Sequence, residues 1–353
     1  MTQAGAPDST TYRVMEWVVE RWVPLAIASG RRRRPVGHVD RDLRCVVSDV
    51  TPEAEDVVSL TLTREGGLRL PAWEPGSHLD LVLPSGAMRQ YSLNGDPADL
   101  SSYRIAVRRI PAERGGGGGS LEVHGLRAGA HVVARGPRNA FPFIGGPGYL
   151  FVAGGIGITP ILPMLRDVVG RRDIPWSLVY TGRSRASMPF LDEIAEMTEG
   201  LEEHVHVWPD DERGTPDVRE ILDLAPHRAL LYCCGPMPMI DALRAVIPDP
   251  QIDALHYERF SPPPVHGGSP FRLTLARTGT EVEVGAEETA LTAVRRVRPS
   301  QAYSCQQGFC GTCKVRVLDG DVEHRDHALA PYERDGHMML CVSRGRGDVV
   351  IDV

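Results

Sequence analysis

Short segments rich in β-branched and apolar residues dominate the first part of the chain. Between about residues 44 and 140, the segments RCVVSDV, DVVSLTLTRE, SHLDLVL and YRIAVRRI are separated by Gly, Pro, Asn and Asp. Strands of this length with frequent turn residues between them are typical of a small antiparallel barrel. We therefore predict an antiparallel β-barrel over residues 41–144.

The pattern changes near residue 145, where apolar strands begin to alternate with longer helical segments. YLFVAGG precedes ITPILPMLRDVV, WSLVYTG precedes FLDEIAEMTE, and ALLYCCG precedes MPMIDALRAVI. This alternation is typical of a parallel sheet with crossover helices. It predicts a parallel α/β domain over residues 145–260.

A segment rich in Pro and Gly, SPPPVHGGSP at residues 261–270, predicts a linker before a third domain at residues 271–353. That domain opens with FRLTLART and TEVEV, which predict a hairpin, followed by a helix at TALTAVRRV. Residues 1–40 form an N-terminal extension, in which we expect one helix near residues 12–28.

Charge and composition exclude several classes of protein. The net charge of −7 gives no general electrostatic reason to bind nucleic acid, and the basic run Arg31–Arg34 is local. The apolar stretch before it is interrupted by charged residues and Pro24, so we expect no transmembrane span. Because the positive charges follow this stretch, a secretory signal is not expected either, and we predict a cytoplasmic protein.

Four of the cysteines lie near the C-terminus in a pattern that indicates a metal site. Cys305, Cys310 and Cys313 form C-x4-C-x2-C, and Cys341 follows. This is the spacing with which plant-type ferredoxins hold a [2Fe-2S] cluster, and Gly308 and Gly311 allow the loop to wrap closely around it. The alternative is a structural zinc site, but such sites usually have two C-x2-C pairs, and here there is one.

Two predicted strand ends of the α/β domain carry residues suited to a dinucleotide. Gly154, Gly155 and Gly157 lie between a strand and the amino end of a helix, where a pyrophosphate can approach backbone N–H groups. The alternative is that these glycines serve close packing. Cys234 and Pro236 end another strand at the same sheet edge, and Cys234 is our candidate for contact with a nicotinamide.

Two segments of the predicted barrel suit a flavin. In MRQYSL, Arg89 offers a bidentate charge to a phosphate, Tyr91 a flat ring to an isoalloxazine, and Ser92 a hydrogen bond to a ring atom. In GGGGGSLEVHGL, glycines and a serine precede a short helical stretch that predicts a second phosphate-binding turn. A flexible hairpin loop is the alternative there.

In this order, the segments resemble the phthalate dioxygenase reductase family, which includes reductase components of vanillate demethylases and of some cytochromes P450. The resemblance runs from about residue 40 to the end and rests on RQYSL, AVRR, GGSLEVH, GPRNAFPF, GGIGITP, YCCGPMPM, YERF, SCQQGFCGTCKVRVLDGDVEHRD and MMLCVSRG. It implies a flavin barrel, a nucleotide domain and a β-grasp ferredoxin domain. The GGS turn followed by PRNAFPF resembles the branch that binds FMN.

The resemblance also assigns residues. FMN contacts are expected from Arg89, Tyr91, Ser92, Ala106, Val107, Arg108, Gly118, Gly119 and Ser120. Nicotinamide nucleotide contacts are expected from Gly155, Gly157, Thr159, Arg183, Ser184, Cys234 and Pro236. Phe260 resembles the aromatic residue that approaches the flavin, so Ser92, Thr159, Cys234 and Phe260 are expected around the reacting atoms. Residues 1–40 and the long glycine run before Ser120 depart from the family pattern.

The implied function is an NADH-dependent reductase that passes electrons through FMN and the [2Fe-2S] cluster to a terminal oxygenase. The oxygenase is either a Rieske non-haem iron enzyme or a cytochrome P450, bound transiently. NADH is expected over NADPH, although Arg183 lies where a 2'-phosphate can be contacted. The alternatives are a redox sensor or electron carrier without turnover, and a zinc-stabilised scaffold.

Overall fold

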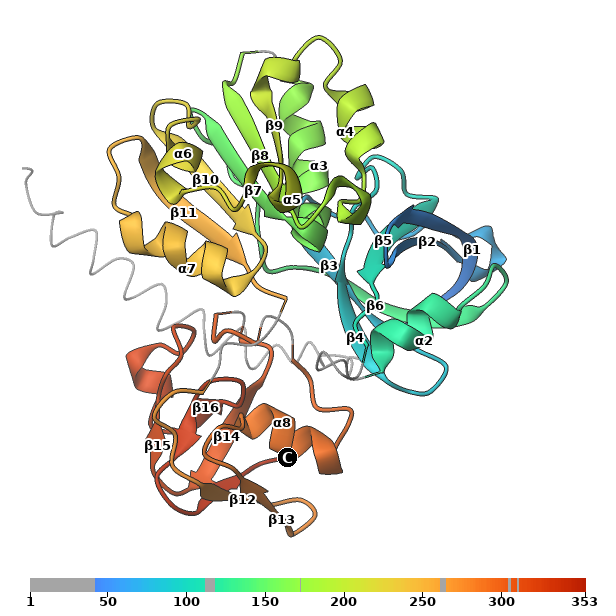
Figure 1. Ribbon diagram of the computed structural model, residues 1–353. Helices are drawn as coiled ribbons and strands as arrows, with labels where there is room; N and C mark the ends of the chain where they lie inside the picture. The colour runs from blue at the N-terminus through green and yellow to red at the C-terminus, as the bar shows by residue number, and fades with distance from the viewer. Residues whose placement is uncertain (1–41, 112–117, 172, 261–264, 304–305, 310) are drawn as a thin grey trace, which may run out of the picture. The chain divides into compact units, whose positions relative to one another are not determined.

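The computed structural model describes residues 42–111, 118–171, 173–260, 265–303, 306–309 and 311–353 (Figure 1). The chain divides into two units, residues 1–41 and 42–353, and the first lies outside the described residues, together with the helix predicted there. Among the described helices, none is long and apolar enough to cross a membrane.

The first part of the described chain is an antiparallel sheet that curls toward closure. Its strand order is β4-β3-β6-β1-β2-β5. A bridge between Leu93 and Ile105 joins the end of β4 to β5, so the first and last strands of that order meet. Alternate residues such as Cys45, Leu60 and Leu79 are fully buried inside, as the predicted barrel requires. The elements are β1 (Asp42–Ala54), β2 (Val57–Arg64), β3 (Ser77–Val82), β4 (Met88–Ser92), β5 (Ser102–Arg108), α2 (Gly119–Gly125) and β6 (His131–Asn139).

The central part is the predicted parallel sheet, with strand order β11-β10-β7-β8-β9. Successive residues of each inner strand enter different cores: Phe151 packs with α3 and α4, whereas Val152 packs with α6 and α7 on the other face. The strands are β7 (Tyr149–Gly154), β8 (Trp176–Gly182), β9 (Val205–Pro209), β10 (Ala229–Cys234) and β11 (Ile252–Glu258). The helices are α3 (Ile158–Val169), α4 (Leu191–Met197), α5 (Asp210–Arg213), α6 (Val218–Leu222) and α7 (Met237–Val246).

The C-terminal part is a mixed sheet packed against one helix. Its order is β13-β12-β18-β14-β16, and β12 pairs in parallel with β18. The predicted hairpin and helix are confirmed as β12 (Phe271–Leu275), β13 (Thr280–Val284) and α8 (Ala290–Val297), which Thr289 caps by accepting the N–H of Thr292. The other strands are β14 (Lys314–Asp319), β15 (Val322–Glu323), β16 (His337–Met339), β17 (Arg344–Gly345) and β18 (Val349–Ile351).

Three arginines make hydrogen bonds that hold distant segments together, and one of them, Arg104, joins the first part to the central part. Arg104 of β5 donates to Glu193 of α4 at 2.8 Å, and Arg166 of α3 donates to the same carboxylate oxygen at 2.6 Å. Arg344 is almost fully buried and donates to the backbone carbonyls of Ser269, Gly285 and Glu288. Because a buried guanidinium is costly without partners, Arg344 holds the end of the predicted linker against the C-terminal sheet.

Candidate functional site

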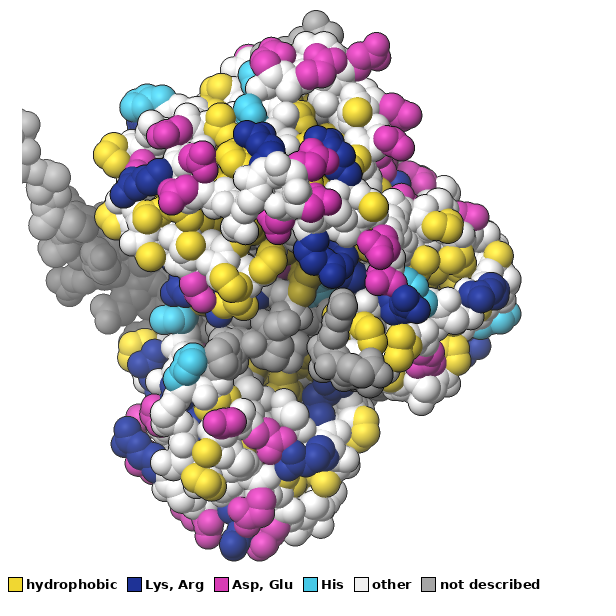
Figure 2. Space-filling model, in the orientation of Figure 1, with side chains coloured by type: hydrophobic (Ala, Val, Ile, Leu, Met, Phe, Trp, Pro, Cys, Tyr) yellow, Lys and Arg dark blue, Asp and Glu magenta, His cyan; other side chains and the backbone are white. Residues whose placement is uncertain are grey.

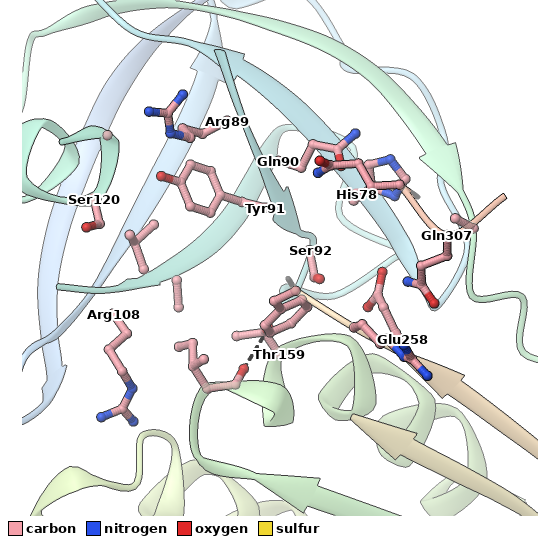
Figure 3. A pocket seen from close by; sticks show the side chains of 18 of the residues that line it. His78, Arg89, Gln90, Tyr91, Ser92, Arg108, Ser120, Thr159, Glu258 and Gln307 are labelled. Carbon is pink, nitrogen blue, oxygen red and sulfur yellow. Dashed lines mark hydrogen bonds between the residues drawn. The ribbon is translucent and has the colours of Figure 1, made fainter. Parts of the chain in front are cut away.

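A cavity of about 360 Å³ is lined by residues from all three parts of the described chain (Figure 3). Its volume lies within the range of ordinary cofactor pockets. Strands β4 and β5 form one wall, the turn after β7 and the end of β11 form another, and Tyr303, Gln306, Gln307 and Phe309 form a third. Ten of the predicted site residues line it: Arg89, Tyr91, Ser92, Ala106, Val107, Arg108, Gly119, Ser120, Thr159 and Phe260.

At one end of this cavity, Arg89 lies against the beginning of α2. A Cβ added at Gly119 would lie 2.4 Å from Nε of Arg89, so a side chain at 119 would displace the guanidinium. Gly118 precedes the helix with a φ of 80°, which favours glycine. Ser120 accepts the N–H of Ile110 at 3.0 Å and faces the same end of the cavity (Figure 3). Arginine, hydroxyl and backbone N–H groups together fit a phosphate.

Tyr91 and Arg108 line the cavity between this end and the nucleotide domain. Burial raises the pKa of Tyr91, so its hydroxyl stays neutral and its ring provides a flat apolar surface for a flavin. Arg108 donates to the carbonyl of Ser187 at 2.8 Å, and burial together with nearby Arg183 lowers its pKa. Arg108 therefore joins the wall formed by β4 and β5, called the flavin wall below, to the loop after β8.

The glycines after β7 have two different roles. A Cβ at Gly157 would lie 2.1 Å from the carbonyl oxygen of Cys234, and one at Gly154 would lie 2.4 Å from Cδ of Pro236. Both glycines therefore serve close packing against the end of β10, the alternative considered above. Gly155 has a φ of 53°, and a Cβ added there would lie 3.4 Å from Nη2 of Arg108. Of the three, Gly155 is the glycine that lies beside Arg108 of the flavin wall.

Thr159 and Cys234 occupy different environments. Thr159 lines the cavity and donates to the carbonyl of Ile156 at 3.0 Å. Cys234 ends β10 with its side chain fully buried in the core, and burial raises the pKa of its thiol. Its predicted contact with a nicotinamide, like those of Gly155, Gly157, Arg183, Ser184 and Pro236, stays a prediction. Cys233 is also fully buried, as expected for a small apolar residue of an inner strand.

The sequence interpretation missed Glu258, which reaches the cavity from the end of β11. It is partly buried, and this burial raises the pKa of its carboxyl to about 8, an effect that nearby Ser92 partly offsets. At neutral pH the side chain is therefore protonated and uncharged. Figure 3 shows it opposite the Arg89 end, near Gln307. Glu258 belongs to the segment YERF, in which the resemblance assigns a role only to Phe260.

We expect ionisation of Glu258 to slow flavin reduction, because a carboxylate in the cavity repels electrons added to the flavin. The rate of flavin reduction by NADH should fall about tenfold between pH 7 and pH 9, following the protonated fraction of the carboxyl. Glu258→Gln, which remains neutral, should lose this dependence when measured by stopped-flow absorbance. An unchanged pH profile in this variant would contradict the role of Glu258.

Described residues on either side of Cys305 lie at the cavity. Tyr303, Gln306, Gln307 and Phe309 line it, and Tyr303 donates to the carbonyl of Met88 on β4 at 3.4 Å. These residues come from the segment that contains the predicted ligands Cys305 and Cys310. The cavity is therefore placed for electron transfer between a flavin and a cluster.

Two of the four predicted ligands, Cys313 and Cys341, are described and buried. The N–H of Leu340 donates to the carbonyl of Cys313 at 3.3 Å, which brings the two ligand segments together. Gly308 and Gly311 have φ values of 82° and 75°, the left-handed backbone that a tightly wrapped loop needs. Cys305 and Cys310 lie outside the described residues. The thiols present fit an iron-sulfur cluster.

Comparison with known proteins supports this arrangement. Residues 151–245 match the oxidoreductase NAD-binding domain, and residues 273–345 match the 2Fe-2S iron-sulfur cluster binding domain. The phthalate 4,5-dioxygenase oxygenase reductase subunit of Pseudomonas putida is 33% identical over 85% of this chain and 93% of its own length. The structure titled phthalate dioxygenase reductase is 31% identical, with a TM-score of 0.66, over 89% of this chain and 98% of that one.

The chain belongs to the phthalate dioxygenase reductase family. It is an oxidoreductase of the flavin and [2Fe-2S] type, whose cofactors are FMN, the cluster and NADH, and its relatives are reductase subunits of oxygenase systems. The reductase also resembles CYP116B46 from Tepidiphilus thermophilus, with 36% identity and a TM-score of 0.64. The matched region covers 88% of the reductase but only 42% of the longer cytochrome P450 chain.

Proposed function

We propose that this reductase takes electrons from NADH and delivers them singly to a separate terminal oxygenase that binds transiently. The observation that carries this proposal is the shared cavity, to which the flavin wall, the nucleotide domain and the cluster segment all contribute. When bound, FMN accepts a hydride and the cluster passes on one electron at a time, which converts a two-electron donor into single-electron transfers.

The chain's own residues bind and orient these groups. We propose that Arg89, Gly118, Gly119 and Ser120 hold the FMN phosphate, while Tyr91, Ser92 and residues 106–108 contact the ring. Thr159, Cys234 and Phe260 surround the nicotinamide, and Gly155, Gly157, Arg183, Ser184 and Pro236 contact the rest of the nucleotide. The four ligands of the cluster are Cys305, Cys310, Cys313 and Cys341. No side-chain acid or base is required for hydride transfer itself.

The domain boundaries and the cellular location form a further part of the proposal. We propose an FMN domain at 41–144, an NAD domain at 145–260, a linker at 261–270 and a ferredoxin domain at 271–353. The NAD-binding match falls within 145–260, and the iron-sulfur match falls within 271–353. Among the described residues, Cys45, Cys233 and Cys234 are buried and form no disulfide, which favours the reducing cytoplasm.

The names of the relatives support an oxygenase as the partner. Their names include dioxygenase and heme-dependent N-demethylase systems, so both Rieske non-haem iron enzymes and haem enzymes are candidate acceptors. We propose that the organic substrate is selected by the oxygenase, because the cavity described above is accounted for by the electron carriers.

The test is an anaerobic absorbance titration of the purified protein with NADH, after the released flavin has been identified chromatographically. We expect FMN, and bleaching of both the flavin and the iron-sulfur bands. A coloured protein that NADH does not reduce would favour the redox sensor. A colourless, zinc-containing protein that regains no activity with added cofactors would favour the scaffold and exclude the reductase.

A further inference from the structure

A second group of charged residues lies outside the flavin cavity, where β8 and β9 end. Gly182 of β8 is paired with Pro209 of β9, so the segments that follow the two strands lie side by side. The first contains Arg183, Ser184 and Arg185, and the second is α5, whose first turn carries three acidic residues. The N–H of Asp211 donates to the carbonyl of Arg183 at 3.1 Å, which fixes α5 against the end of β8.

Arg185 and Glu212 form a two-pronged ion pair at this edge. Nε of Arg185 lies 2.8 Å from Oε1 of Glu212, and Nη2 lies 3.3 Å from Oε2. Both side chains are about half exposed, at 55% and 46%. Figure 2 shows basic and acidic side chains beside one another on the face that carries α5. The guanidinium face that suits a phosphate is therefore already occupied by a carboxylate.

The pair of Arg185 and Glu212 lies where the adenosine ribose of the dinucleotide is expected. In doubly wound sheets the glycine-rich turn follows the first strand of the unit, and the 2'-oxygen of the adenosine ribose lies near the end of the next strand. In this chain β7 precedes the glycine-rich turn and β8 is the next strand. A ribose hydroxyl tolerates a neutralised arginine there, whereas the 2'-phosphate of NADPH needs an available guanidinium and is repelled by acidic residues.

We propose that Glu212 is a specificity-determining residue, which disfavours NADPH by pairing with Arg185, so that Arg183 is not joined by a second guanidinium, and by adding negative charge beside the ribose. This inference rests on the nucleotide site in the proposed function. Arg185 does not appear among the residues that the family pattern assigns to the nucleotide. When Arg185 is no longer paired with Glu212, its guanidinium can bind a 2'-phosphate at the ends of β8 and β9.

The experiment compares Glu212→Gln, Arg185→Ala and the double variant with the unaltered protein, using ferricyanide as acceptor. Glu212→Gln should raise kcat/KM for NADPH about tenfold, as expected for one new charge-assisted hydrogen bond, and change that for NADH by less than about twofold. The gain should disappear in the double variant, because it depends on Arg185.

A matched control lies at the opposite edge of the same sheet. Asp253 accepts two hydrogen bonds from Arg228, at 3.2 and 3.0 Å, just where β10 and β11 begin. Asp253→Asn removes the same kind of exposed ion pair and the same charge, and should leave the preference for NADH unchanged. A similar gain for NADPH in this control would overturn the proposal, since it would show an effect of net charge alone.

Calorimetric binding of adenosine 2',5'-bisphosphate separates this proposal from the proposed function, because it requires no flavin reduction. Tighter binding to Glu212→Gln than to the unaltered protein supports the proposal even if NADH fails to reduce the flavin. Equal binding and an unchanged kcat/KM for NADPH overturn it. A gain that survives in the double variant also overturns it, because Arg185 would then have no part in the selection.

Discussion

Replacing Cys341 with serine is expected to remove the [2Fe-2S] cluster and to abolish electron delivery to single-electron acceptors. Cys341 is buried beside the segment of Cys313, and a serine hydroxyl does not supply the thiolate that holds iron. Iron content should fall from about two atoms per chain to near zero. Cytochrome c reduction by NADH should disappear, whereas reduction of the flavin by NADH should persist, because the flavin wall lies on β4 and β5.

Cys45 provides the control for this variant. It is fully buried in the flavin domain, and burial raises its pKa to about 11, so it is an uncharged thiol remote from the cluster segment. Cys45→Ala should keep its iron and its cytochrome c activity, with some loss of thermal stability. If Cys341→Ser retained the visible and electron paramagnetic resonance signals of the cluster, the assignment of Cys341 as a ligand would be wrong.

A single methyl group at residue 119 is expected to weaken FMN binding strongly. In Gly119→Ala the new Cβ would fall 2.4 Å from Nε and 2.7 Å from Cγ of Arg89, so the arginine must leave its place at the start of α2. Charge-assisted hydrogen bonds contribute about 1.5–3 kcal/mol, so the Kd for FMN should rise about 10- to 100-fold. Fluorescence titration of the flavin-free protein with FMN measures this change.

Gly125, at the other end of α2, is the matched control. A Cβ there meets no heavy atom within 4 Å, so Gly125→Ala adds the same methyl group without touching Arg89. Its affinity for FMN should equal that of the unaltered protein. Equal affinity in Gly119→Ala would instead show that Arg89 does not hold the phosphate.

The elements with strong local patterns could be predicted from the sequence. The segment ITPILPMLRDVV became α3, because its apolar residues recur at helical spacing and Pro160 suits the first turn. WSLVYTG became β8, because a short, continuous apolar run between turn residues is typical of a buried parallel strand. The residues that line the cavity from β4 could also be predicted to lie together, because Arg89, Tyr91 and Ser92 fall within four positions of one strand.

Residues that reach the site from distant segments could not be found in this way. Glu258 and Tyr303 line the same cavity as Tyr91 only because the end of β11 and the segment before the cluster loop fold against β4. Nothing in their local sequence indicates that proximity. The glycines after β7 illustrate a related limit. The sequence does not distinguish a glycine required for packing, such as Gly157, from one that leaves room for a ligand.

The third wall of the flavin cavity, made by Tyr303, Gln306, Gln307 and Phe309, has a consequence for biosynthesis. Ribosomes produce the chain from its amino end, so β4 and β5 can fold long before Tyr303 and Phe309 leave the exit tunnel. A flavin captured early would sit in a pocket open on one side, and would be retained more firmly once the last 80 or so residues had folded over it. We therefore expect folding of the iron-sulfur segment and retention of the flavin to be coupled steps in the maturation of a single polypeptide.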